Sequence, residues 1–216
     1  MTSSMTSMKG KRVIITGPTS GVGKEIALQV AALGAELILG CRGLKKGTET
    51  AAEITRRTGS SKLVVMQIDT SSQKSIREFA RDFRRKYRRL DVLINNAAGN
   101  RGTLPRVTSV DGIELTFATN VLGYFLLTQE LLDVLKKNAP ARIINVASVA
   151  GIGTQGSSIA YCASKAAVIH LTRCVAMQLG EQYVRVNSIS PGGIAFVNRA
   201  SNFMGTPGPE ESSSSR

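Results

Sequence analysis

The chain has 216 residues, of which 42% are hydrophobic and 20% charged, and a formal net charge of +13. This length and composition fit one soluble globular domain, and no run reaches the ~20 apolar residues that a membrane span needs. The three cysteines lack the spacing of a disulfide framework or a metal site, and a single histidine argues against a metal cluster. The N-terminus lacks the apolar stretch of a secretory leader. We therefore predict a cytoplasmic protein with no metal site.

Short apolar runs alternate with segments of helical periodicity along the whole chain. Most of these runs are apolar throughout rather than alternating, which is typical of strands covered on both faces. The sequence therefore predicts an α/β fold with a doubly wound, Rossmann-like parallel sheet of six strands. The expected strands are 12–16, 37–39, 63–68, 92–94, 142–146 and 184–189, and the expected helices are 21–33, 44–58, 72–88, 111–137 and 158–179.

Composition divides the chain into three parts. Residues 1–10 are rich in Ser, Thr and Met and are predicted to be a flexible N-terminus. Residues 11–200 carry the strand and helix pattern and are predicted to form a single dinucleotide-binding and catalytic domain. Residues 201–216 are rich in Ser, Gly, Pro and Glu, and we expect a disordered tail there.

A glycine-rich turn joins the first expected strand to the first expected helix. Gly17 permits the tight turn, Gly21 permits close approach of the backbone to a pyrophosphate, and Gly23 permits close packing of helix on sheet. The N–H groups at the start of the helix can then bind the phosphate charge. Thr19, Ser20 and Val22 complete this predicted phosphate loop.

The end of the second strand indicates which dinucleotide is bound. An NAD site places a carboxylate at the C-terminal end of that strand, where it binds the ribose hydroxyls. The only acid in this stretch is Glu36, at the opposite end, whereas Arg42 follows the strand directly. A guanidinium suits a 2′-phosphate, so we predict NADP(H) rather than NAD(H). The alternative is that Arg42 is an ordinary exposed loop arginine.

A tyrosine and a lysine lie four residues apart, at Tyr161 and Lys165. On a helix these two positions share a face, so the phenol and the ammonium can converge. A nearby cation favours phenolate and lowers the tyrosine pKa from its usual ~10. Tyr161 is therefore a candidate general acid and base for a carbonyl/alcohol couple. The alternative is an ordinary surface pair, which helices often carry.

A basic run accounts for much of the positive charge. Such a run can bind nucleic acid or an anionic membrane surface. It can also be a solvated helix end, where cations complement the helix dipole, and we favour this second interpretation because no nucleic-acid motif accompanies the run. The residues concerned are Arg81, Arg84, Arg85, Lys86, Arg88 and Arg89.

In chain order, these motifs resemble those of the short-chain dehydrogenase/reductase family. Residues 16–23 resemble its cofactor loop, and 95–99 resemble its Asn-Asn-Ala-Gly motif with an extra alanine. Tyr161 and Lys165 match its Tyr-x-x-x-Lys pair, and Pro191-Gly192 matches the motif after its sixth strand. Segments 40–42 and 120–128 are similar to a retinol-dehydrogenase-like branch, while 161–192 are more similar to acyl-alcohol and sugar-alcohol members, so the substrate stays open.

The resemblance implies a role for each matching residue. Ser148 would hydrogen-bond the substrate oxygen, Tyr161 would transfer the proton, and Lys165 would lower the tyrosine pKa and hold the nicotinamide ribose. Asn120 would support Lys165 through a water-linked relay. The resemblance further implies a secondary alcohol or carbonyl substrate and a homo-oligomer. Cofactor contacts would come from Asp69, Thr70, Asn96, Ala97, Pro191 and Gly192, together with Tyr161 and Lys165.

The sequence departs from the family pattern after the sixth strand. The apolar pattern fades after Val197, so the family's seventh strand is expected to be absent and the chain to be a shortened member. Three hypotheses follow. The first is an NADP(H)-dependent oxidoreductase, the second a catalytically weak cofactor-binding or regulatory protein, and the third a basic module that associates with nucleic acid or a membrane surface.

Overall fold

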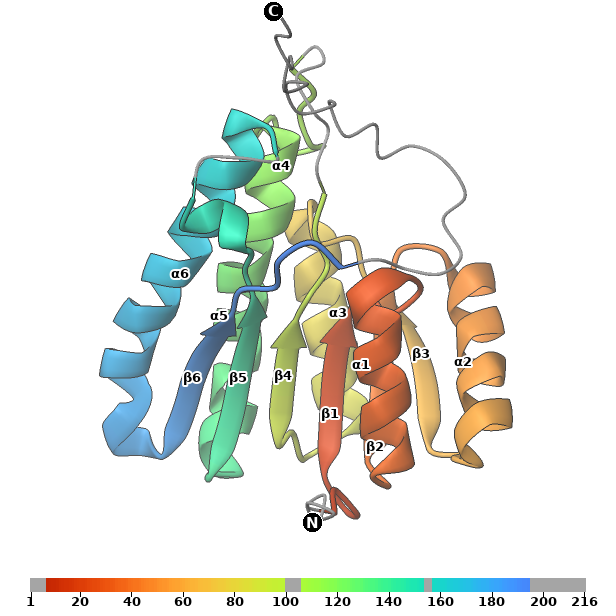
Figure 1. Cartoon of the computed structure of the whole chain (residues 1–216). Helices are drawn as coiled ribbons and strands as arrows, with labels where there is room; N and C mark the ends of the chain where they lie inside the picture. The colour runs from red at the N-terminus through yellow and green to blue at the C-terminus, as the bar shows by residue number, and fades with distance from the viewer. Residues whose placement is uncertain (1–6, 100–105, 154–156, 195–216) are drawn as a thin grey trace, which may run out of the picture.

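Six strands form one parallel sheet in the computed structural model, which describes residues 7–99, 106–153 and 157–194. The sheet order is β3-β2-β1-β4-β5-β6 (Figure 1), so the chain starts in the middle and builds outward on both sides, as in dinucleotide-binding sheets. The predicted fold class is confirmed. The strands are β1 (Arg12–Thr16), β2 (Glu36–Cys41), β3 (Leu63–Gln67), β4 (Val92–Asn95), β5 (Ala141–Val146) and β6 (Val184–Ile189).

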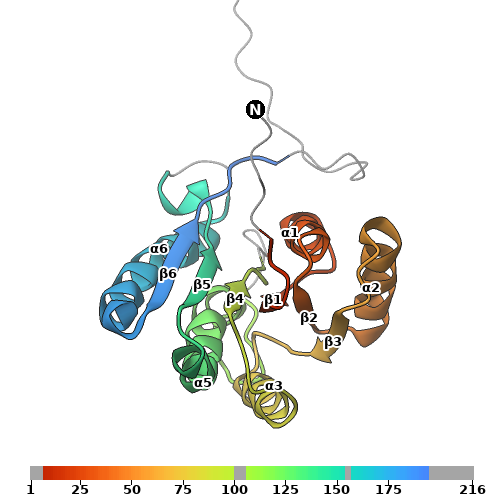
Figure 2. The ribbon, with the colours of Figure 1, turned by 90° about the horizontal axis from the view of Figure 1, so that it is seen from below.

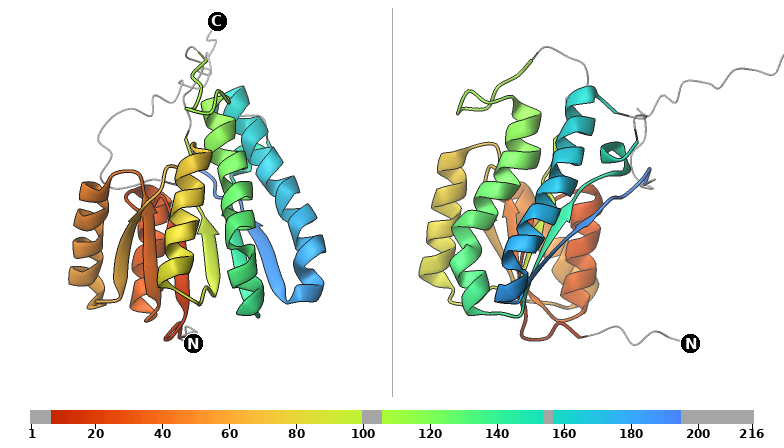
Figure 3. Two further views of the ribbon diagram at one scale, coloured as in Figure 1. Left: turned by 180° about the vertical axis from the view of Figure 1, so that it is seen from behind. Right: turned by 90° about the vertical axis from the view of Figure 1, so that its left-hand side faces the viewer.

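Helices cover both faces of this sheet, as the views from below and from the sides show (Figures 2 and 3). Two helices, α1 (Gly21–Ala32) and α2 (Leu44–Thr58), lie on one face. The opposite face carries α3 (Gln73–Lys86), α5 (Gly123–Lys137) and α6 (Ile159–Leu179). Shorter helical turns are α4 (Leu115–Phe117), the π-turn η1 (Ala118–Leu122) and the 3-10 turns η2 (Val149–Gly151) and η3 (Gly180–Gln182).

The two helical layers explain the uninterrupted apolar strands. Along β1, Ile14 belongs to the core under α3 and α5, whereas its neighbours Val13 and Ile15 belong to the core under α1. All three are 0% exposed. Positions 13–16 of the central strand are therefore all buried, which is why the sequence shows no alternation there.

One predicted helix begins later than expected. The periodicity predicts a helix over 111–137, but residues 107–114 form a turn in which the Ser109 amide donates to the Ile113 carbonyl at 2.7 Å. Gly112 has φ +74°, a conformation that favours glycine. The Glu114 carboxylate then accepts from the amides of Thr116 and Phe117 and caps the helix start. The turn depends on contacts that helical periodicity does not register.

The basic run begins within the second half of α3 and continues beyond its last turn. Arg84 hydrogen-bonds Glu130 on α5, and Arg89 forms two hydrogen bonds of 2.8 Å with Asp91. Burial raises the pKa of Asp91, but the hydrogen bonds from Arg89, the Arg12 amide and Lys11 outweigh it and hold that pKa below its usual range. Part of the positive charge is therefore neutralised within the fold.

Several sequence predictions concern the ends of the chain. The predicted tail, 201–216, lies outside the described residues, as do residues 1–6 of the predicted flexible N-terminus. Met8 is hydrogen-bonded to the Leu33 carbonyl at 2.9 Å. Within the described residues β6 is an edge strand of the sheet, and none of the helices there combines the length and apolarity needed to cross a bilayer.

Candidate active site

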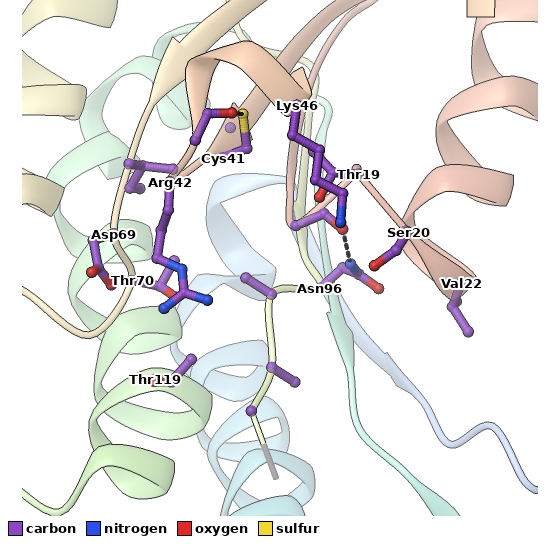
Figure 4. A pocket seen from close by; sticks show the side chains of 18 of the residues that line it. Thr19, Ser20, Val22, Cys41, Arg42, Lys46, Asp69, Thr70, Asn96 and Thr119 are labelled. Atoms are coloured by element: carbon purple, nitrogen blue, oxygen red, sulfur yellow. Dashed lines mark hydrogen bonds between the residues drawn. The ribbon is translucent and has the colours of Figure 1, made fainter. Parts of the chain in front are cut away.

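A cavity of about 480 Å³ opens at the carboxyl ends of β1, β2 and β4 (Figure 4). At this edge of the sheet the connections leave β1 and β4 toward opposite faces, and such a switch point is where open α/β sheets bind ligands. The lining residues that the sequence predicted for the cofactor are Gly17, Thr19, Ser20, Val22, Gly23, Arg42, Asp69, Thr70, Asn96 and Ala97.

The glycines of the loop are required by its geometry. Gly17 and Gly21 have φ of +65° and +56°, which L side chains rarely adopt. A Cβ on Gly17 would lie 2.8 Å from the Cα of Ala97. A Cβ on Gly23 would lie 2.3 Å from both the Asn96 Nδ2 and the Gly17 carbonyl oxygen. The loop therefore packs backbone to backbone against the segment that follows β4.

Hydrogen bonds fix this packing. Asn96 Nδ2 donates to the carbonyls of Thr16 and Gly17 at 2.9 and 3.0 Å. The buried Thr16 hydroxyl accepts from the amides of Asn96 and Ala97, each at 3.0 Å. Ser20, which caps α1, makes no side-chain capping bond, so the first-turn N–H groups of α1 stay available to a ligand. A phosphate is the ligand that such a helix start binds.

The charged residues on the cavity wall are two cations and one acid. Arg42 follows the last residue of β2, and Lys46 lies in the first turn of α2, both with their side chains at the cavity (Figure 4). Asp69 lies beyond β3, and its Oδ1 accepts from the amide and the hydroxyl of Ser71. Glu36, at the far end of β2, pairs with Arg12 at 2.6 Å and is therefore remote from the cavity.

Lys46 was not identified from the sequence. It stands among polar and basic residues of α2, so its composition carries no signal that separates it from a solvated helix face. Its proximity to Arg42 in sequence, at the start of the helix that follows Gly43, was the available clue.

Tyr161 and Lys165 lie together near the start of α6. The helix begins at Ile159, after Ser158, whose hydroxyl accepts from the Tyr161 amide. Lys165 is 1% exposed, its Nζ donates to the Val146 carbonyl at 2.6 Å, and the same Nζ is 5.6 Å from the centroid of the Tyr161 ring. Burial lowers the pKa of Lys165 to about 8.

Ser148 lies at the turn that follows β5. It caps η2 by accepting from the Ala150 amide at 3.2 Å. Gly151 ends η2 so close to α6 that a Cβ there would lie 2.6 Å from the Lys165 carbonyl carbon. The Val149 amide donates to the Pro191 carbonyl at 3.0 Å, which ties the segment after β6 to the same turn. The Ser148 turn is therefore held against the helix that carries Tyr161 and Lys165.

Asn120 lies in the π-turn η1 and is fully buried. Its Oδ1 accepts from the Gly99 amide at 2.9 Å, and its Nδ2 donates to the Gly99 carbonyl at 3.1 Å and to Ser164 at 3.0 Å. Ser164 in turn donates to the Tyr161 carbonyl at 2.7 Å. Asn120 thus joins the segment after β4 to the helix of the tyrosine, through bonds to neighbours of Lys165 rather than to Lys165.

The predicted residues accordingly fall into two neighbouring groups. One group lines the cavity at β1, β2 and β4, and the other surrounds the ends of β5 and β6 and the start of α6. Gly21 belongs to the loop but not to the cavity wall. The members of the second group, none of which lines the cavity, are Asn120, Ser148, Tyr161, Lys165, Pro191 and Gly192.

A doubly wound sheet with a glycine loop at its switch point and a Tyr-x-x-x-Lys pair beside it defines a class of oxidoreductases that use dinucleotides. Comparison with known families agrees, because the family model described as short chain dehydrogenase matches residues 11–204. The chain belongs to the short-chain dehydrogenase/reductase family, whose members bind a nicotinamide cofactor.

Relatives and solved structures point the same way. Retinol dehydrogenase 13 of Mus musculus is 40% identical over 202 residues, which are 88% of this chain and 60% of the relative. Retinol dehydrogenase 11 of Homo sapiens is 39% identical over 212 residues, covering 91% and 65%. The structure titled Pseudomonas aeruginosa RhlG/NADP active-site complex has a TM-score of 0.79 and 32% identity, covering 88% of this chain and 75% of that one. The chain thus spans less than two thirds of the length of these curated relatives.

The comparison corrects one sequence prediction. A cytoplasmic location was expected from the absence of a signal or an apolar span. That prediction is wrong, because it conflicts with the related retinol dehydrogenases 11, 12 and 13, which are membrane-associated, microsomal proteins. The inference failed because hydropathy reports only segments that a sequence visibly carries, whereas association with a membrane has other physical routes.

Proposed function

We propose that this chain is an NADP(H)-dependent oxidoreductase that interconverts an alcohol and the corresponding carbonyl compound, with Tyr161 as acid and base. The observation that carries the proposal is the buried Lys165 ammonium, 5.6 Å from the Tyr161 ring. A cation close to a phenol favours its phenolate form. The same arrangement allows Tyr161 to give up a proton in reduction and to accept one in oxidation.

The preference for NADP(H) rests on charge at the cavity. Arg42 and Lys46 line it near the end of β2, while Glu36, the acid of that strand, is paired with Arg12 at the other end. Two cations and no strand-end carboxylate suit a 2′-phosphate better than a ribose diol. The RhlG structure, whose title names NADP, is consistent with this choice.

The other groups would position the reactants. Nicotinamide, when bound, supplies or accepts the hydride. The glycine loop and the start of α1 would bind the pyrophosphate, and Asp69 and Thr70 would face the adenine. Ser148, beside the Tyr161 helix, would donate a hydrogen bond to the substrate oxygen as charge develops on it. Asn120 would hold the Tyr161 turn through Ser164.

The substrate is proposed to be lipophilic. Ile152 and Ile159 are 75% and 88% exposed, and Val149, next to Ser148, is also exposed. These apolar side chains follow Ser148 and precede Tyr161 in the sequence, and we propose that they line the end of the site where the substrate enters. The relatives named retinol dehydrogenase support a long apolar alcohol or aldehyde of the retinoid kind. Assembly into a dimer or tetramer remains a prediction.

The test is turnover of NADPH with a panel of carbonyl compounds that includes retinal, alongside calorimetric titration of NADPH. We expect oxidation of NADPH by the intact chain and a loss of about a thousandfold or more in Tyr161→Phe, with NADPH affinity unchanged. Binding of NADPH without turnover by the unaltered chain would favour the weak cofactor-binding protein instead. Activity that survives in Tyr161→Phe would refute the assigned role.

A further inference from the structure

Tyr124 is a second buried phenol beside the proposed catalytic pair. It lies in the first turn of α5 and is 1% exposed. The centroid of its ring is 5.5 Å from Lys165 Nζ, and the centroid of the Tyr161 ring is 5.6 Å from the same nitrogen. The ammonium therefore has an aromatic ring of α5 and an aromatic ring of α6 as neighbours.

The two buried side chains also share a backbone acceptor. Lys165 Nζ donates to the Val146 carbonyl at 2.6 Å, and the Tyr124 hydroxyl donates to the same oxygen at 3.4 Å. The lysine bond is short and strong, whereas the tyrosine bond is long and weak. The contribution of Tyr124 therefore comes from its ring more than from its hydroxyl.

A buried ammonium needs compensation for lost hydration. Burial is the cause that lowers the pKa of Lys165, and the described residues give it a carbonyl and two rings as partners, with no carboxylate paired to it. The faces of aromatic rings attract cations, most strongly where water is excluded. Burial, followed by the charge of Tyr161, raises the pKa of Tyr124 well above its ordinary value, so this phenol stays neutral and does not itself compete for protons.

We propose that Tyr124 is a positioning residue, whose ring keeps the Lys165 ammonium charged and directed between the Val146 carbonyl and Tyr161. This deepens the proposed function, on which it rests, because the cation beside the Tyr161 ring is the observation that carries that function. Tyr124 itself transfers no proton and packs in a core cluster with Val121, Ala147 and Val168 rather than on the wall of the cofactor cavity.

The titratable groups that face Lys165 are few, which makes the proposal testable by titration. Tyr161 faces it from α6 and Tyr124 from α5, while β5 contributes the Val146 carbonyl. A change in the lysine pKa on substitution at Tyr124 can therefore be assigned to the ring or to the hydroxyl. Lysine labelled with ¹³C at Cε reports that pKa by NMR without any turnover, with Lys165→Met identifying the signal.

Two substitutions separate the ring from the hydroxyl. Tyr124→Phe keeps the ring, so the Lys165 pKa should stay within about 0.3 units of the unaltered value. Tyr124→Leu removes the ring, and the pKa should fall by about one unit because the ammonium loses a desolvated cation–π contact. Phe83→Leu, at a buried position of α3 remote from Lys165, is the matched control for the lost volume and should leave that pKa unchanged.

A third variant protects the test against misfolding. Trifluorophenylalanine incorporated at position 124 keeps the shape of phenylalanine but weakens the negative face of the ring, so the Lys165 pKa should again fall relative to Tyr124→Phe. Equal lysine pKa values in the phenylalanine and trifluorophenylalanine proteins would overturn the proposal, as would a Tyr124→Leu value equal to that of the unaltered chain.

The pH profile of turnover then connects the ring to the chemistry. In the direction of alcohol oxidation, the low-pH limb of kcat/KM should move to higher pH in Tyr124→Leu and stay in place in Tyr124→Phe. A chain without turnover would refute the proposed function and leave the NMR result standing. If Tyr124→Leu lowers the Lys165 pKa but the limb of its kcat/KM profile does not move, the proposed link between Tyr124 and Tyr161 is overturned.

Discussion

A single methyl group at Gly23 should disrupt the cofactor loop. The Cβ of Gly23→Ala would lie 2.3 Å from Asn96 Nδ2 and from the Gly17 carbonyl, whereas ordinary contact begins at 3.4 Å. The new Cβ and these two atoms must therefore move apart by at least 1.1 Å, which requires either a shift of α1 or a rotation of the Asn96 amide. Rotation breaks the bonds of 2.9 and 3.0 Å that hold Thr16 and Gly17.

The cost can be estimated from these contacts. Overpacking of this kind costs about 1–3 kcal/mol of folding free energy, and each lost hydrogen bond adds about 1 kcal/mol. Because Gly17 belongs to the predicted phosphate loop, NADPH affinity should also fall about tenfold or more, which corresponds to about 1.4 kcal/mol. Urea unfolding measures the first quantity and calorimetric titration of NADPH the second.

Gly180→Ala is the matched control. Gly180 has helical backbone angles, and a Cβ there meets nothing within 4 Å. Alanine should therefore leave NADPH affinity unchanged and stability equal or higher by up to about 1 kcal/mol. If Gly23→Ala and Gly180→Ala had the same stability and the same NADPH affinity, close packing of the loop on Asn96 would not explain why residue 23 is a glycine.

Two further predictions concern charge. In Arg42→Ala, NADPH affinity should fall about 10- to 100-fold while NADH affinity changes less than threefold, because only the 2′-phosphate loses a charge-assisted partner. Parallel titrations with both cofactors check this, and equal losses of NADPH and NADH affinity would contradict the assignment of Arg42 to the 2′-phosphate. Because burial lowers the pKa of Lys165 from 10.5 to about 8, the unfolded chain binds more protons between these values. The unfolding free energy of the cofactor-free protein should therefore rise with pH across this window, by up to about 3 kcal/mol relative to Lys165→Met. Parallel curves of unfolding free energy against pH for the two proteins would refute burial of the Lys165 ammonium.

The fold was predictable from local patterns because the central strands are buried on both faces. The apolar runs of β1 and β5, the strand β6 and the helices α2 and α6 were located to within about a residue of the structure. The start of the helix predicted over 111–137 was wrong for a different reason. Thr108 and Glu114 form an antiparallel β-bridge, and such backbone pairing between separate residues is not encoded in helical periodicity. An amphipathic pattern continues through such a turn without marking it.

The candidate site was predictable as a set of residues but not as an arrangement. Motif spacing identified the glycine loop and the Tyr161–Lys165 pair, yet it gave no sign that only the loop lines the cavity. In the sequence, nothing distinguishes Lys46 from the other basic residues of α2, or Tyr124 from the other large residues of α5. Both gain significance only from neighbours supplied by other elements, namely the cavity beside β2 and the Lys165 ammonium.

The segment after β4 is what sets the two parts of the site relative to each other. At one end Asn96 holds the Gly17 carbonyl at 3.0 Å. At the other end Gly99 is bound through both its amide and its carbonyl to Asn120, which donates to Ser164 on the helix of Tyr161. A shift of this short segment would therefore move the predicted phosphate loop and the proposed proton donor together. Proton transfer next to a nicotinamide requires the distance between these parts to be fixed, and the two asparagines supply that constraint from one stretch of backbone.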